Sequence, residues 1–167
     1  NPNRVSVTEN LQDVFKDYSD RMLLVSDNGG LVWLDKQIAF VSLMDKNTYQ
    51  DLIRFTKKHT EGICVLCGLD GGYIEKKDEQ HKDFINKFFT HMTIVDDLSE
   101  LDIKANKFTI YCPEANAKDY LEEFYAPRYQ EELSLTLGDT IWIDIMNKGI
   151  SKGSAMRFIA DKLGITT

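Results

Sequence analysis

The chain has 167 residues and a formal net charge of -7, with 43% hydrophobic and 28% charged residues. These values fit an ordered protein with a real core, as one domain or two small units. The negative charge argues against a general nucleic-acid surface, because phosphate backbones are held mainly by Lys and Arg. Without an apolar run long enough for a membrane span or a signal-peptide pattern, we expect a cytoplasmic protein with no membrane partner.

The first predicted elements follow the pattern of a parallel α/β layer. Apolar residues at helical spacing predict an amphipathic helix over 8–20, with Thr8 as its N-cap. A continuous apolar run over 22–26 then predicts a strand buried on both faces, as in a parallel sheet. The following Asn28 and Gly29 predict the sharp turn that ends this strand.

The middle of the chain changes to pairs of strands separated by helices. Residues 31–43 predict two strands joined at Asp35 and Lys36. This alternation is typical of an antiparallel sheet that is covered on one face by helices. The predicted strands cover 63–67, 71–75, 92–95, 107–112, 133–137 and 140–146, and the predicted helices cover 46–59, 79–90 and 114–125.

The last element is a predicted helix with one apolar stripe, and it stops at Gly164. Both ends of the chain therefore look like parallel α/β structure, whereas the middle does not. We interpret the middle as an insertion between two fragments of another domain. The predicted fold class is α/β, with an α+β unit at 44–146 between core fragments at 1–43 and 147–167.

Several motifs look functional but have a simpler structural interpretation. Cys64 and Cys67 resemble a redox pair, yet residues three apart on a strand point to opposite faces, which favours core thiols. Asp70 lies in a Gly-rich stretch that is typical of a hairpin turn. Asp96 and Asp97 could bind a hard cation, but the residues that follow favour helix capping.

The histidines and serines support neither zinc chemistry nor a serine hydrolase. His59, His81 and His91 share no metal-ligand spacing, and no serine lies in a Gly-x-Ser-x-Gly elbow.

Lys152 follows a glycine-bearing turn and precedes the last predicted helix. Its ammonium could lie beside the free N–H groups of the helix start, which is a favourable place for phosphate. From local features alone, however, a lysine near a helix start is more often only solvated.

Three stretches together resemble the haloacid dehalogenase superfamily, specifically the Cof-type phosphatases with a large α/β cap. These stretches are "SDNGGLVW" at 26–33, "LDGGYI" at 69–74 and "IDIMNKGISKGSAMRFIADKLGI" at 143–165. The third stretch resembles the family's third motif and is the most specific, and the resemblance covers nearly the whole chain. It implies a HAD-like fold in which residues 44–146 are the cap domain and the flanks belong to a Rossmann-like core.

The resemblance implies phosphoryl transfer through an aspartyl-phosphate. An aspartate attacks phosphorus, a second one protonates the leaving group, carboxylates hold Mg²⁺, and a lysine, here Lys152, neutralises nucleophile and phosphate. Asn28 and Gly29 are weaker candidates for substrate binding. The implied substrates are small phosphorylated metabolites, with sugar phosphates as the commonest class.

The chain also departs from the family pattern. It lacks the DxDGT motif, and it stops at "LGITT", where the family would continue from the third motif into the metal-binding Gly-Asp motif. We therefore expect an internal segment of a Mg²⁺-dependent phosphatase, with no metal site and no turnover of its own. The alternative is a non-catalytic binding or interaction module derived from such a cap. Exposed edges of the core fragments could also pair two copies into a dimer.

Overall fold

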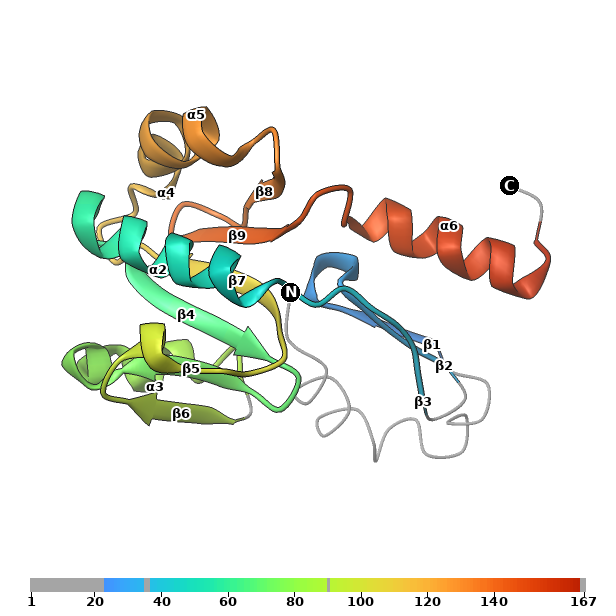
Figure 1. The fold of residues 1–167 in the computed structure, drawn as a ribbon, viewed down its shortest axis with the longest axis horizontal. Helices are drawn as coiled ribbons and strands as arrows, with labels where there is room; N and C mark the ends of the chain where they lie inside the picture. The colour runs from blue at the N-terminus through green and yellow to red at the C-terminus, as the bar shows by residue number, and fades with distance from the viewer. Residues whose placement is uncertain (1–22, 35–36, 90, 166–167) are drawn as a thin grey trace.

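A computed structural model describes residues 23–34, 37–89 and 91–165. These residues form a three-stranded and a six-stranded sheet with helices packed against them (Figure 1). The helix predicted at 8–20 lies outside the described residues. In the part of the chain that the structure describes, no helix has the length and apolar character needed to cross a membrane.

The small sheet has the order β1-β2-β3, with β1 at Leu23–Ser26, β2 at Leu31–Leu34 and β3 at Gln37–Val41. Both strand pairs are antiparallel. The sequence predicted a parallel strand at 22–26, but the described partner of β1 is antiparallel, because the short 3-10 turn η2 at Asp27–Gly29 reverses the chain at once. The two strands predicted around residues 35 and 36 are confirmed as β2 and β3.

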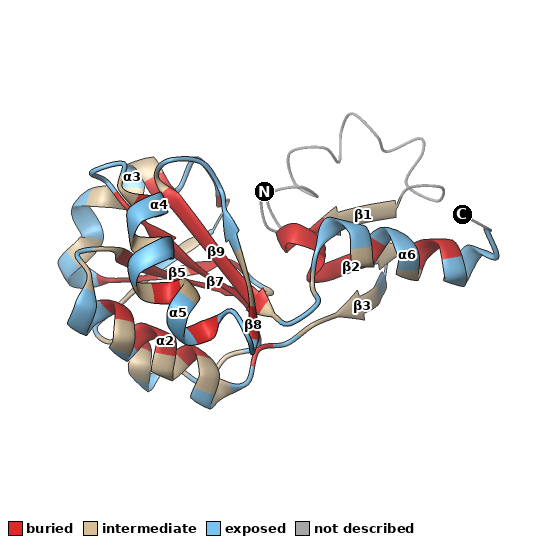
Figure 2. Ribbon diagram, turned by 90° about the horizontal axis from the view of Figure 1, so that it is seen from above, coloured by how far each residue is buried: buried red, intermediate tan, exposed pale blue. Residues whose placement is uncertain are grey.

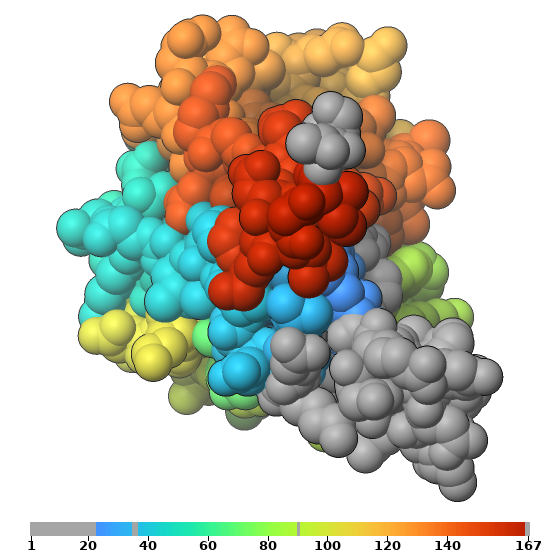
Figure 3. Space-filling model, turned by 90° about the vertical axis from the view of Figure 1, so that its right-hand side faces the viewer, coloured from blue at the N-terminus to red at the C-terminus, as the bar shows by residue number. Residues whose placement is uncertain are grey.

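The last helix, α6 at Lys152–Leu163, packs on this small sheet. Ala155 and Ile159 join Val32 in one apolar cluster, and the ring of Phe158 lies 5.2 Å from that of Phe40. Gly164 ends α6 in a left-handed conformation, as predicted. The two ends of the described chain therefore pack together, with α6 lying over the small sheet in the space-filling view (Figure 3).

The large sheet has the order β6-β5-β4-β7-β9-β8, and all its pairs are antiparallel except β5 with β6. The bounds are β4 Ile63–Gly68, β5 Gly72–Glu75, β6 Met92–Val95, β7 Ala105–Tyr111, β8 Leu133–Leu137 and β9 Trp142–Asn147. All six strands agree with predicted positions to within two residues, and the central strands of the sheet are buried along almost their whole length (Figure 2).

One face of the large sheet is covered by helices. The long helix α2 at Lys46–His59 lies there, capped by Asp45. Beside it runs a continuous helical segment whose middle has π geometry, made of α4 Ala117–Tyr120, η5 Leu121–Tyr125 and α5 Ala126–Tyr129. Tyr49, Leu52 and Tyr125 pack against Phe108 and Ile143 from the sheet to form the main core.

The other face of the large sheet carries a smaller apolar cluster. The sequence predicted that only one face would be covered, but both faces are partly covered. The helix predicted at 79–90 is instead a 3-10 segment, η3 Lys76–His81, followed by one turn, α3 Lys82–Ile85. Ile85 and Phe89 from this region pack on Val65 and Ile74. The fold class is nevertheless α/β as predicted, with a largely antiparallel sheet as its centre.

The motifs with a simple structural interpretation behave as predicted. Cys64 and Cys67 are buried in different clusters on opposite faces, and burial raises the pKa of each thiol to about 12. Asp70 lies in the β4–β5 hairpin and accepts a hydrogen bond of 2.7 Å from Tyr73. Asp97 caps η4 at Leu98–Glu100 by accepting a hydrogen bond of 2.8 Å from the Ser99 amide.

Candidate functional site

The turn between β1 and β2 has an unusual backbone. Three successive residues have positive φ angles, namely Asp27 at 50°, Asn28 at 55° and Gly29 at 100°. Left-handed conformations are strained for residues with a side chain, although Asn and Asp tolerate them better than most. All three residues are buried, so packing holds the turn in this conformation.

Gly29 brings this turn against the start of α6. A Cβ atom at this position would lie 2.2 Å from the Ser151 carbonyl oxygen and 3.1 Å from the Lys152 amide nitrogen. Atoms do not approach so closely, so only glycine fits here. Three residues that sequence analysis proposed separately, Asn28, Gly29 and Lys152, therefore lie at one place in the fold.

The start of α6 is well formed. The Ser151 side chain accepts a hydrogen bond from the Ser154 amide, and the Ser154 side chain accepts one from the Ser151 amide, which together make a capping box. Lys152 is exposed, and among the described residues its ammonium has no hydrogen-bond or ion-pair partner. The first turn thus offers a cation and helix N–H groups at one end of the Asn28–Gly29 turn.

At the other side of the turn lies a buried polar cluster that sequence analysis did not predict. Asp144 on β9 accepts hydrogen bonds from the Asn28 amide at 2.7 Å and the Thr109 hydroxyl at 2.6 Å. The Lys107 ammonium lies 3.5 Å from Asp144 and 3.9 Å from Asp27. The Lys107 side chain is only 3% exposed, so one ammonium group and two carboxyl groups are buried together here.

The charged groups of this cluster have shifted pKa values. Burial raises the pKa of Asp27 above its ordinary value, and the Lys107 ammonium opposes this only in part. Burial also acts to raise the pKa of Asp144, but Lys107, Thr109 and Asn28 outweigh it and hold that pKa below the ordinary value. Burial acts to lower the pKa of Lys107, yet Asp144 and Asp27 raise it overall. Lys107 therefore stays charged.

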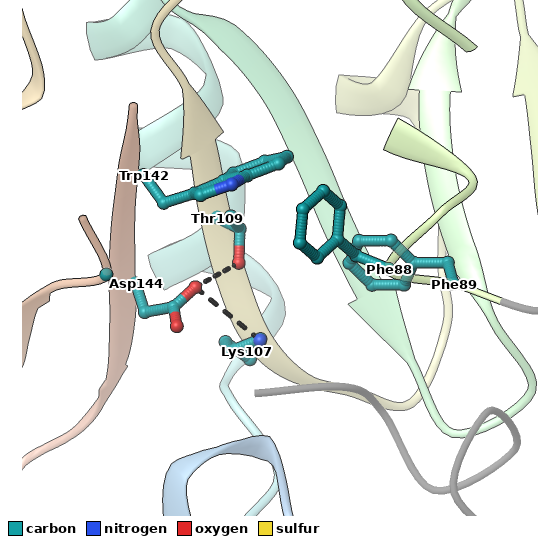
Figure 4. Close-up of a pocket in the computed structure, with 7 residues that line it drawn as sticks. Phe88, Phe89, Lys107, Thr109, Trp142 and Asp144 are labelled. Carbon is teal, nitrogen blue, oxygen red and sulfur yellow. Dashed lines mark hydrogen bonds and ion pairs between the residues drawn. The ribbon is translucent and has the colours of Figure 1, made fainter. Parts of the chain in front are cut away.

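A pocket opens beside this cluster on the face of the sheet that α2 does not cover (Figure 4). Its polar side is formed by Lys107, Thr109 and Asp144, and its apolar side by Phe88, Phe89 and Trp142. The Phe88 and Trp142 rings are 5.2 Å apart in an edge-on arrangement, and Phe88 is 40% exposed at the rim. A pocket with an apolar wall and a few convergent polar groups has the composition of a small-molecule site.

The sequence carried a weak signal for these missed residues. Along β7, Lys107, Thr109 and Tyr111 alternate with apolar residues, and Asp144 interrupts the apolar run of β9. Such alternation in an antiparallel strand normally indicates a solvent-facing side. Nothing local shows that the Asn28 turn and the residues around Phe88 cover this side.

The described residues do not fit the Mg²⁺ ion that the resemblance implies. Among them, no three His, Cys, Asp or Glu side chains come close enough to hold a metal. In the cluster beside the pocket, the two buried carboxylates Asp27 and Asp144 share the Lys107 ammonium, which occupies the position that a cation would need. We therefore assign these residues no metal-binding role.

Comparison with known families identifies the chain. The model of the haloacid dehalogenase-like hydrolases matches residues 7–167. The chain belongs to this family. The haloacid dehalogenase resemblance of the sequence is thereby confirmed. The solved structures of similar fold include a HAD/COF-like hydrolase from Plasmodium vivax.

That Plasmodium vivax structure has a TM-score of 0.82 and 15% identity, and the match covers 99% of this chain and 60% of that one. SMU.1108c from Streptococcus mutans has a TM-score of 0.83 and 21% identity, with coverage of 95% and 60%. The HAD subclass IIB sugar phosphatase BT4131 has a TM-score of 0.69 and 16% identity, with coverage of 95% and 58%. No curated protein matches the chain.

At these identities the solved structures establish the fold alone. The chain also spans only 58% to 60% of the length of these three structures. The division into segments at 1–43, 44–146 and 147–167 and the roles of Lys152, Asn28 and Gly29 stay predictions.

Proposed function

We propose that these residues form the specificity cap and adjoining core segments of a phosphatase that hydrolyses small phosphorylated metabolites, with sugar phosphates as the first candidates. The observation that carries the proposal is the contact of Gly29 with Ser151 and Lys152, which joins the start of α6 to the buried cluster around Asp144. The family match and the fold shared with a sugar phosphatase support it.

In this proposal Lys152 is the phosphate-binding cation. Its exposed ammonium and the first N–H groups of α6 favour an anion, because the helix dipole and the lysine charge act in the same direction. Asn28 and Gly29 hold the start of α6 in place next to the pocket. In phosphoryl transfer such positioning and charge compensation supply most of the catalysis.

The family chemistry uses an aspartate nucleophile from a DxDGT motif, which the 167 residues do not contain. We propose that a longer protein supplies this aspartate together with its Mg²⁺ site. The described residues contribute substrate binding, charge compensation and exclusion of water.

The coding sequence on both sides of these residues, followed by an assay, tests the proposal. A protein that includes an upstream DxDGT motif should release inorganic phosphate from a panel of phosphorylated metabolites, and Lys152→Ala should abolish the release. Lys162→Ala is the matched control, because Lys162 lies in the last turn of the same helix. Full activity of the Lys152→Ala variant would contradict the proposed role.

The alternative is a binding module that has lost the chemistry. The buried polar cluster and its pocket would then serve recognition alone. An intact gene without the DxDGT motif, whose product binds phosphorylated metabolites and releases no phosphate, would decide for the module.

A further inference from the structure

Among the described residues, the ammonium of Lys107, which lines the pocket, has only long contacts with its carboxylate partners. The two carboxylate oxygens nearest to the Lys107 ammonium, from Asp144 and Asp27, lie at 3.5 and 3.9 Å. Charge-assisted hydrogen bonds between an ammonium and a carboxylate are usually about 2.7–2.9 Å long. Because a buried ammonium is costly unless it is hydrogen-bonded, its N–H groups are suited to an additional oxygen from a ligand in the pocket.

The same cluster has an unused acceptor. Among the described residues, Oδ1 of Asp27 has no hydrogen-bond donor, although Asp27 is only 1% exposed. The second oxygen of Asp27 accepts a hydrogen bond of 3.1 Å from Ser26. Asp27 does not itself line the pocket, so the polar groups of the cluster that face a ligand there are Lys107, Thr109 and Asp144.

The charge of the cluster limits what the oxygen can belong to. Two carboxylates lie within 4 Å of Lys107, so the ammonium charge is already compensated. A carboxylate or phosphate in the pocket would face Asp144, with Asp27 nearby on the far side of Lys107, and no free positive charge would offset the repulsion. A hydroxyl group, which is neutral and both donates and accepts, fits the cluster better.

The aromatic wall and the volume of the pocket further limit the kind of organic group that it can bind. Trp142 and Phe88 present aromatic surface, against which the C–H groups of a carbon chain or ring can pack. The pocket has a volume of about 80 Å³. On this scale one water needs roughly 10–15 Å³, so the space beside Lys107 can take a group of several heavy atoms.

We infer that this pocket binds the uncharged, hydroxyl-bearing organic part of a phosphomonoester substrate and selects against substrates whose organic part carries a second anionic group. The inference rests on the proposed function, because the pocket and Lys152 flank the same Asn28–Gly29 turn. It adds that Lys107, Phe88 and Trp142 determine specificity. Lys107 orients a hydroxyl by donating to it, while the two rings hold the carbon skeleton.

Tryptophan fluorescence tests this inference on the chain itself. The chain has 2 tryptophans, Trp33 and Trp142, so a Trp33→Phe background leaves the pocket residue as the reporter. The probes are erythritol, a four-carbon polyol, and erythronate, which has the same carbon chain with one end oxidised to a carboxylate. We expect a saturable change in Trp142 emission with erythritol in the millimolar range, and binding of erythronate weaker by about tenfold.

Two variants in the same background locate the binding. Lys107→Met should abolish the response to erythritol. If that variant does not fold, Phe88→Ala remains, because Phe88 is an exposed rim residue, and it should weaken binding by about three- to tenfold. The matched control is Phe124→Ala on the opposite, helix-covered face of the sheet, which should bind erythritol like the parent.

The outcomes separate this inference from the proposed function. A lack of saturable erythritol binding, equal or tighter binding of erythronate, or unchanged binding in Phe88→Ala would each overturn the inference. Phosphatase activity could persist in all three cases. Conversely, erythritol binding that depends on Phe88, in a protein that never releases phosphate, would support the pocket and contradict the proposed phosphatase.

Discussion

The two faces of the large sheet differ in chemistry, although the same strands form both: one face is mainly apolar and the other carries a cluster of buried charged groups. On β7 and β9, Phe108, Ile110, Ile143 and Ile145 point to the face that α2 covers, where they pack in the main apolar core. The opposite face of the same two strands carries Lys107, Thr109 and Asp144, which are almost equally buried. A face built only for stability would not bury a lysine and two aspartates.

The polar face of the sheet therefore carries an energetic cost that the apolar face does not. Replacing a buried ion pair by well-packed apolar residues is often neutral or even stabilising. The polar cluster is therefore weak evidence for stability and stronger evidence for function, because it connects the turn at Asn28 to a pocket. The apolar face supplies the rigid support on which this cluster rests.

The largest expected effect comes from Lys107→Met. Removal of the ammonium leaves Asp144 and Asp27 buried and uncompensated, so the free energy of unfolding should fall by about 3–5 kcal/mol. Urea denaturation measures this. The control is Lys46→Met, because Lys46 forms an exposed ion pair of 2.9 Å with Asp102 and should leave stability nearly unchanged. Equal effects of the two substitutions would show that burial of Lys107 has no special role.

Gly29→Ala should be the next most harmful change. The new Cβ would collide with the Ser151 carbonyl, and the residue would also keep a positive φ, so we expect a loss of about 2–4 kcal/mol and displacement of the start of α6. Gly164→Ala is the control, since its φ is also positive, at 67°, but no atom lies within 4 Å of the added Cβ. It should cost only about 1 kcal/mol. Similar losses for both, by thermal denaturation, would argue against the close contact.

The smallest effects concern the two aspartates and have opposite signs. Asp144 has a lowered pKa, so its contribution to stability is present above its unfolded pKa and is lost as pH falls through the folded pKa. Asp144→Asn should therefore lose about 1–3 kcal/mol near pH 7 and less in acid. Asp27 has a raised pKa, so its ionisation disfavours folding as pH rises through the folded value.

Asp27→Asn should consequently gain on the order of 1 kcal/mol near pH 7, because a neutral amide avoids the cost of a buried negative charge. It should lose this advantage in acid, where the Asp27 carboxyl of the parent is itself neutral. Denaturation of both variants across acidic to neutral pH checks the signs. Parallel pH profiles for the two variants would contradict the assignment of a raised pKa to Asp27 and a lowered pKa to Asp144.

Sequence reasoning was successful where local pattern decides the structure. The period of apolar residues located α2 and the strands of the large sheet, and Gly164 marked the end of α6. It was wrong where the decision depends on distant contacts. The strand at 22–26 was expected to lie in a parallel sheet, because an apolar run indicates burial on both faces without naming the partner strand.

The candidate site shows the same limit. Lys152 was predicted as a site residue from a sequence motif. Its position beside Gly29 could not be predicted, because it depends on contacts between distant parts of the chain. Lys107 and Asp144 were missed because a polar residue on a strand looks the same whether it faces solvent or a buried cluster. Their importance depends on residues separated by 116 positions, as between Asn28 and Asp144.

The most direct test of the account is a titration of the chain with inorganic phosphate, followed by NMR of the backbone amides. If the Asn28–Gly29 turn and the start of α6 form one phosphate site, the amide signals of Gly29, Lys152 and Gly153 should shift together and saturate. Lys152→Ala should abolish these shifts and Lys162→Ala should not. Phosphate shifts that leave these three amides unchanged, or that persist in Lys152→Ala, would contradict the account.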